Sequence, residues 1–325
     1  MPALEASFVV AVTLAIVAPH LLLLRRVTPS VAATVWLSAL ALRALAAIGL
    51  SIFVFVYLPK TSTYDAVTHW CWHEVLPLIA THLGFSGHPI AHAAIALPGL
   101  VLAGSLLWVL FGAARAWLSL RPKLRRAIGT GPLGSTIIPD DQIVVGVPTL
   151  GRGRIVVSDS ALAAMDAQEM RASLSHELGH IHRRHRPVLH FASVLGALAR
   201  LLPGTKSAVL ELKLCLERDA DDYAVSHAND PLALASAICK AAGPTPVLGT
   251  TGLGGEGRVL SRLDHLQGHV PQAGTTLERL TRLVAAASVA LVLAVVVTLP
   301  SWALATPRAA AHITPAAEAH CVGDH

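Results

Sequence analysis

The sequence predicts a mainly α-helical membrane protein, with four transmembrane helices and one α+β domain on the cytoplasmic side. Three observations support this fold class. The 325 residues are 54% hydrophobic and only 14% charged, whereas a soluble globular domain has about 25% charged residues. Four apolar stretches are long enough to cross a bilayer, which requires about 20 residues. Basic residues cluster on one side of these stretches, as expected of a protein inserted in a single orientation.

The four predicted transmembrane helices lie at both ends of the chain. Their approximate bounds are 6–24, 34–58, 93–117 and 282–305. The first stretch is not expected to be a cleaved signal peptide, because no basic residue precedes it and Arg25 and Arg26 follow it. Residues 1–117 are therefore predicted to form an N-terminal membrane domain with three transmembrane helices.

The distribution of basic residues predicts how the chain is oriented. Arg25 and Arg26 separate the first two helices, and further basic residues flank the segment between the third and fourth helices: Arg115, Arg121, Lys123, Arg125, Arg126, Arg279 and Arg282. Cytoplasmic segments carry such an excess of positive charge. We therefore predict a multi-pass plasma-membrane protein with its N-terminus outside and a cytoplasmic domain at 118–281. The loop 59–89 and the tail 306–325 would be extracytoplasmic.

Arg43 interrupts the second predicted transmembrane helix. A charged residue inside a membrane can mark a functional site. The apolar stretch is longer than a span requires, however, and a long side chain can extend its charged end to the membrane surface. We predict that Arg43 does so.

The cytoplasmic segment contains signals for both strands and helices. Two short β-branched runs, 142–147 and 154–158, predict a hairpin. Asp166 and Glu169 form a capping box that predicts a helix from Ala167 to about Arg184. The remaining expected elements are helices at about 188–202 and 207–227, a helix beginning at Pro231, and a glycine-rich loop at 250–257.

The helix predicted from Ala167 carries an HExxH motif. His176 and His180 are four residues apart, so both rings lie on one helix face and can bind the same Zn²⁺. Glu177 is placed to accept a proton from water that the metal activates. The alternative is an ordinary polar helix face, because His182 and His185 make this segment rich in histidine and short motifs recur by chance.

A second acidic motif makes the metal-site interpretation more specific. Glu217 and Asp221 are four residues apart on the helix predicted at 207–227 and share a face. Glu217 is predicted as the third ligand, which leaves the fourth position for water, as in catalytic zinc sites. Asp221 is predicted to accept a hydrogen bond from the ring of a ligand histidine.

These motifs resemble those of the BlaR/MecR-type antirepressor membrane zinc metallopeptidases. The similarity lies in the segments RIVVSDSAL, HELGHIHRRH and ERDADDYAV and in the order of the predicted membrane helices. The HExxH and ExxAD pair is also similar to that of HtpX-like and CAAX-prenyl-protease-like peptidases. Two features depart from the antirepressors. They usually carry an acidic residue where His185 stands, and their penicillin-binding sensor domain is not expected in the 306–325 tail.

The resemblance implies a gluzincin-type fold, Zn²⁺ as the cofactor, and a hairpin edge that binds the substrate backbone. It implies site residues that agree with the motif analysis: metal ligands His176, His180 and Glu217, catalytic Glu177, and Asp221 beside a ligand. The strand at 154–158 is the predicted docking edge, with ordinary sheet structure as the alternative.

We predict an integral-membrane zinc metalloendopeptidase that cleaves a cytoplasmic protein, such as a transcriptional repressor, in response to an outside signal. The expected partners are this protein substrate and the lipid bilayer, without direct binding of nucleic acid. One alternative is HtpX-like quality control of membrane proteins. Another is a membrane signal transducer without catalytic activity, although a purely structural zinc site would not need Glu177.

The predicted topology separates the four cysteines. Cys71 and Cys321 would lie outside, whereas Cys215 and Cys239 would lie in the reducing cytoplasm. A Cys71–Cys321 disulfide is one possibility, and a metal or redox sensor with the neighbouring histidines is another. Solvated side chains with neither role are the remaining alternative.

Overall fold

The structure is a computed structural model that describes residues 2–22, 24–54, 89–148, 154–227, 229–242, 250–252, 259–268 and 274–305. Its helices are α1 (Pro2–Leu21), α2 (Pro29–Ile52), α5 (Pro89–Arg125), α6 (Asp159–Ala164), α7 (Ala167–His182), α8 (His185–Leu198), α9 (Thr205–Ser226), α10 (Pro231–Ala241), α11 (Val259–Leu266) and α12 (Thr275–Ala305). Its strands are β1 (Gly129–Thr130), β2 (Thr136–Ile138), β3 (Val145–Pro148), β4 (Val156–Ser158) and β5 (Thr250–Gly252). The fold is therefore mainly helical, with one small mixed sheet.

Three helices of the described chain are long and apolar enough to cross a membrane. They are Pro29–Ile52, Leu97–Arg125 and Thr275–Thr298, and they coincide with the second, third and fourth predicted spans. The first predicted span falls on α1. Its apolar part, Val9–Leu21, is shorter than the 18 residues that the other three helices exceed. The protein is thus a membrane protein, and a fourth span at α1 stays a prediction.

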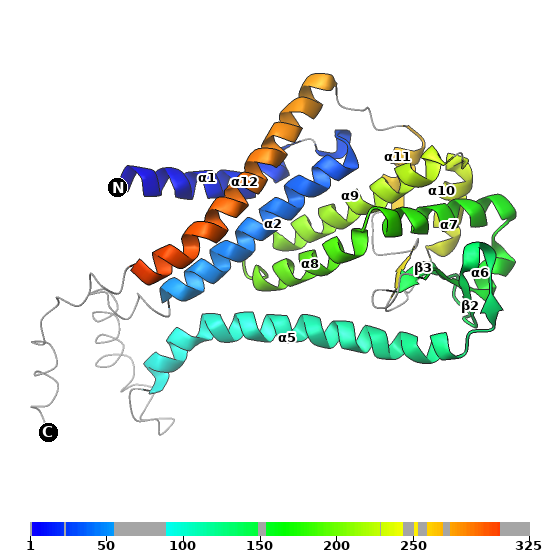
Figure 1. Ribbon diagram of the computed structural model, residues 1–325, viewed down its shortest axis with the longest axis horizontal. Coiled ribbons are helices and arrows are strands. Elements are labelled where there is room, and N and C mark those ends of the chain that lie inside the picture. Colours follow the sequence, from blue (N-terminus) through cyan, green and yellow to red (C-terminus); the bar gives the residue numbers. More distant parts are fainter. Residues whose placement is uncertain are drawn as a thin grey trace, which may run out of the picture.

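Helix α2 connects the membrane helices to the rest of the fold. It packs against α9, α12, α8 and α1, and Figure 1 shows α2, α8, α9 and α12 side by side. The buried face of α2 is rich in alanine, including Ala32 and Ala39, which lets neighbouring helices approach closely. It shares one hydrophobic core with Leu212 and Leu216 of α9. A candidate transmembrane helix and α9 therefore form a single packed unit.

Arg43 does not extend to the membrane surface as predicted. Arg43 is only 2% exposed, and its Nη2 donates a hydrogen bond to the carbonyl oxygen of Ile16, 3.0 Å away. The same nitrogen lies 2.8 Å from Nε2 of His20. The prediction was wrong because α1 packs on α2 and supplies polar partners within the apolar surroundings, so the guanidinium need not reach water.

The sheet confirms the predicted hairpin and corrects its proposed role. Within the described residues the strand order is β1-β2-β4-β3-β5. β3 pairs antiparallel with β4, and β4 also pairs in parallel with β2. Val156 has a partner on each side, so the prediction that the 154–158 strand is a free docking edge was wrong. β5 lies in the segment predicted as a glycine-rich loop and pairs with β3.

Helix α7 begins where the sequence predicted. The Asp166 side chain accepts hydrogen bonds from the backbone nitrogens of Gln168 and Glu169, and the Glu169 side chain accepts one from the Asp166 nitrogen. α7 then packs against α9, α10 and β3, and its apolar face contributes Met170 and Leu174 to a second hydrophobic core. The capping box thus sets the start of α7, and these packing contacts place the helix between the sheet and α9.

The predicted domain boundaries remain predictions. The boundary between residues 117 and 118 falls within α5, which continues to Arg125. Most of the loop 59–89 and all of the tail 306–325, both predicted to be extracytoplasmic, lie outside the described residues, as do Cys71 and Cys321. Cys215 is buried and Cys239 is exposed, and both are free thiols.

Candidate metal centre

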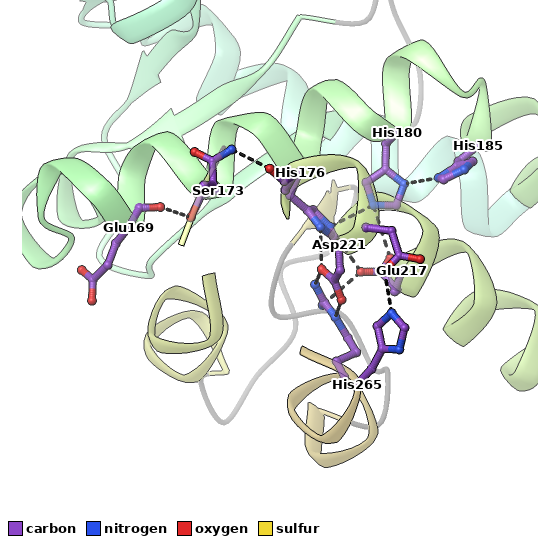
Figure 2. Close-up of polar contacts among 12 residues, drawn as sticks. Glu169, Ser173, His176, His180, His185, Glu217, Asp221 and His265 are labelled. Carbon is purple, nitrogen blue, oxygen red and sulfur yellow. Dashed lines mark hydrogen bonds and ion pairs between the residues drawn. The ribbon is translucent and has the colours of Figure 1, made fainter. Parts of the chain in front are cut away.

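Three side chains from two helices converge on one point. His176 and His180 lie one turn apart on α7, and Glu217 faces them from α9 (Figure 2). The Nε2 atoms of the two histidines are 3.1 Å apart. The Glu217 carboxylate oxygens lie 3.5 Å from Nε2 of His176 and 3.6 Å from Nε2 of His180. The described structure thus brings together all three residues predicted as metal ligands.

The geometry of these donor atoms fits a zinc ion. Ligands at about 2.0–2.1 Å from a tetrahedral Zn²⁺ are roughly 3.3–3.4 Å from one another, close to the three separations observed. Both histidines also have a polar partner at Nδ1, on the other side of the ring. With the proton on Nδ1, each Nε2 turns a lone pair toward the other, which is unfavourable unless a cation lies between them.

The charge of the buried site also fits a divalent cation. Glu177, Asp221 and Arg262 are buried beside the ligands, and Glu217 is only 15% exposed. When ionised, the three carboxylates and the single guanidinium leave two negative charges uncompensated, which is the charge that Zn²⁺ balances. Burial raises the pKa of Glu177 to about 8. This rise indicates that without a metal the site does not readily accept a further negative charge.

The pKa values of His176 and Glu217 also agree with a positively charged ligand. Burial opposes a charged ring at His176, yet the carboxylates of Asp221 and Glu217 raise its pKa to about 9. Burial opposes the charge of Glu217 as well, but Arg262 and the two ligand histidines together outweigh it and lower the pKa of Glu217 to about 2. A positive charge is therefore stabilised on the His176 ring.

Asp221 lies beside His176 and accepts two hydrogen bonds from Arg262. Oδ1 of Asp221 lies 2.8 Å from Nδ1 of His176, and its role as the hydrogen-bond acceptor for this ring stays a prediction. Arg262 of α11 donates to both Asp221 oxygens, at 2.9 and 2.6 Å, and its Nη1 lies 3.1 Å from Glu217. Sequence reasoning missed Arg262. No local signal marks it, because α11 is a short helix far along the chain and a lone arginine is usually exposed.

His180 has a different partner on its outer side. Nδ1 of His185, the first residue of α8, lies 2.9 Å from Nδ1 of His180 (Figure 2). The opposite nitrogen of His185 lies 2.9 Å from Asp219 of α9. Sequence reasoning noted His185 only as part of a histidine-rich segment and as a departure from the antirepressors. The position of Asp219 within the acidic motif was the available signal for this contact.

Gly179 lets α7 and α9 approach closely beside the ligands. A Cβ atom at this position would lie 3.1 Å from Cβ of Tyr223 and 3.2 Å from two atoms of its ring. Any larger residue would push α9, and with it Glu217, away from the two histidines. The close helix contact explains a glycine within α7, where it costs up to about 1 kcal/mol relative to alanine.

Comparison with known protein families gives a match to one part of the chain. Residues 144–209 match the family model described as Peptidase family M48. The matched segment contains β3, β4, α7 and α8, including the HExxH motif, and ends within α9 before Glu217. No curated protein and no solved structure matches the chain.

Proposed function

We propose that this chain, a zinc-dependent metalloendopeptidase with a Peptidase family M48 domain, cleaves a cytoplasmic protein in response to a signal received in the membrane. The observation that carries the proposal is the packing of α9, the helix that contributes Glu217, along the candidate transmembrane helix α2. A peptidase with no link to its membrane helices would not require this shared core.

The residues of the site have distinct roles in this proposal. His176, His180 and Glu217 would hold Zn²⁺, which supplies a Lewis acid for the scissile carbonyl and lowers the pKa of water. Glu177 accepts the proton of the attacking water and passes it to the departing amine. Asp221 keeps the His176 ring in position through its 2.8 Å contact.

Polar contacts at the basic end of α2 support the coupling of membrane and site. Nη2 of Arg25 lies 3.1 Å from Glu211, about 9 Å along α9 from Glu217 at a rise of 1.5 Å per residue. Thr28 donates to Glu278 of α12 through both its hydroxyl group, at 2.6 Å, and its backbone nitrogen, at 3.1 Å. A movement of α2 relative to α12 would therefore pull on α9 as well.

The cytoplasmic orientation and the substrate rest on the sequence. Basic residues flank the segment that contains the metal centre, which places it inside by the positive-inside rule. A transcriptional repressor is the substrate implied by the resemblance to the BlaR/MecR-type peptidases. HtpX-like quality control would use the same chemistry on many misfolded membrane proteins, so the range of substrates separates these two functions.

The proposal is tested by comparing the wild-type protein with Glu177→Gln. Gln keeps the shape of the side chain but cannot accept the water proton, so zinc content should be unchanged while peptide cleavage falls by about 10²–10⁴-fold. Metal analysis and a peptide-cleavage assay on the purified full-length proteins measure both quantities. Retained proteolysis in the zinc-loaded variant would rule out Glu177 as the base.

Quantitative proteomics of cells expressing either protein then identifies the substrate class. Signal-responsive cleavage predicts one soluble protein, or very few, whose fragments appear only with the wild-type enzyme and only under a particular stimulus. Cleavage of many membrane proteins without a stimulus would favour quality control and overturn the signalling function.

A further inference from the structure

The partner of His180 on the side away from the metal is a second imidazole. Nδ1 of His185 lies 2.9 Å from Nδ1 of His180, and Nε2 of His185 lies 2.9 Å from Oδ2 of Asp219. His185 is 3% exposed, and the other two residues are also buried. His185 is not among the three side chains that could hold the metal. Figure 2 shows it beside His180, beyond the point where those side chains meet.

The contacts that join His180, His185 and Asp219 are consistent with one arrangement of protons on the two rings. The Asp219 carboxylate can only accept, so Nε2 of His185 must be the donor to it. A neutral His185 then has a lone pair on Nδ1 and accepts a hydrogen bond from Nδ1–H of His180. His180 consequently has its own lone pair on Nε2, the nitrogen that faces His176 and Glu217. This is the tautomer that binds a metal.

We infer that His185 and Asp219 are positioning residues that set the tautomer and the ring orientation of His180 for zinc binding. The inference rests on the proposed roles of His176, His180 and Glu217 as ligands. The two histidine ligands are thus held differently. His176 contacts a carboxylate directly, whereas His180 reaches Asp219 only through the ring of His185.

The backbone at Arg184 and the side chain of Arg183 hold His185 and Asp219 in these positions. Arg184 adopts a left-handed conformation, with φ 56°, which costs a non-glycine residue roughly 1–2 kcal/mol. The resulting turn starts α8 at His185 and brings its ring back over His180. Asp219 also accepts a hydrogen bond from Nη1 of Arg183 at 2.7 Å, so both of its oxygens have partners. The alternative is that these contacts serve only to join α7 and α8 to α9.

Two substitutions of His185 distinguish these roles. His185→Phe keeps a ring of similar size but has no acceptor, so zinc should bind about 10- to 100-fold more weakly, as when other groups that orient a metal ligand are removed. In His185→Asn the side-chain oxygen occupies the position of Nδ1 and can still accept from His180. Its zinc affinity should stay within about threefold of wild type, which is a smaller loss than the 10- to 100-fold expected for His185→Phe. His182→Phe is the matched control, because His182 is exposed at the end of α7, the helix of His180, and its replacement should leave affinity unchanged.

Zinc affinity is measured on the full-length protein in detergent by competition with a chelator. The visible spectrum of the Co²⁺-substituted protein reports coordination geometry, and it should change in His185→Phe but not in His185→Asn. A purely structural role predicts instead a lower unfolding temperature of the metal-free protein, with zinc affinity and the cobalt spectrum unchanged in both variants. That result would overturn the inference.

Asp219 provides an independent test. Asp219→Leu should weaken zinc binding in the wild-type background but add little in the His185→Phe background, because the two residues act on His180 in series. Asp219→Asn, whose side-chain oxygen can still accept from His185, should restore most of the affinity. Fully additive losses would contradict the inference. A wild-type protein that binds no zinc would instead disprove the metal site itself, so the two failures are distinguishable.

Discussion

The strongest energetic prediction concerns Arg262, which neutralises the buried carboxylates beside the metal ligands. Arg262 is 1% exposed, and its guanidinium contacts Asp221 through two nitrogens and Glu217 through the third. Arg262→Met keeps a long side chain but removes the charge. Removing one partner of a buried ion pair costs about 3–5 kcal/mol, because the other charge stays buried without compensation. We therefore expect the metal-free variant to be destabilised by this amount.

Zinc binding should restore part of the stability that Arg262→Met loses. The ion brings two positive charges to the same carboxylates, so the rise in melting temperature on adding zinc is expected to be larger in Arg262→Met than in the wild-type protein. Thermal unfolding of both proteins in detergent, with a chelator and with excess zinc, measures this difference. For a folding unit of about 150–250 residues, each 1 kcal/mol shifts Tm by about 2–4 °C, so the metal-free shift should be roughly 6–20 °C.

Arg282→Met is the matched control for this experiment. Arg282 forms an ion pair with Glu278 on α12, but its side chain is 64% exposed, and such pairs contribute at most about 1 kcal/mol. If the metal-free Arg262 variant unfolds at the wild-type temperature, or shifts no more than the Arg282 variant, the idea that Arg262 offsets buried negative charge is refuted.

Three further predictions follow from the same structure. Glu217→Ala removes one of three ligands and should strip most of the zinc from the purified protein, whereas full zinc occupancy by metal analysis would require a different ligand. Gly179→Ala should destabilise the protein by about 1–3 kcal/mol through overpacking against Tyr223, and an increase in Tm would contradict the close contact. The hydrogen bond from Lys240 lowers the pKa of Glu169 from its ordinary value of 4.5 to about 2, so the stability it contributes is full above about pH 4.5 and lost as the pH falls toward 2. Between pH 5 and 3, Glu169→Gln should therefore lose less stability than wild type in thermal unfolding, and equal losses would contradict this.

Features that depend on local spacing could be predicted from the sequence. The i, i+4 separation places His176 and His180 on one face of a helix whatever surrounds it, and the same holds for Glu217 and Asp221. The start of α7 depends on the capping box around Asp166, whose hydrogen bonds join residues two and three positions apart. The three candidate membrane spans follow from the length of apolar stretches, which is again a local property.

Other features depend on which distant segments meet, and only the tertiary structure decided them. A β-branched run can form an edge or an interior strand, and β4 became interior because β2 pairs with it from an earlier part of the chain. The charge of Arg43 would favour a position near water, but α1 provides polar partners for it. Arg262 and His185 reach the metal centre through a separate helix and a left-handed turn. The energy of burying a charge or a strand edge depends on partners that local sequence does not specify, and for this reason these residues could not be placed without the fold.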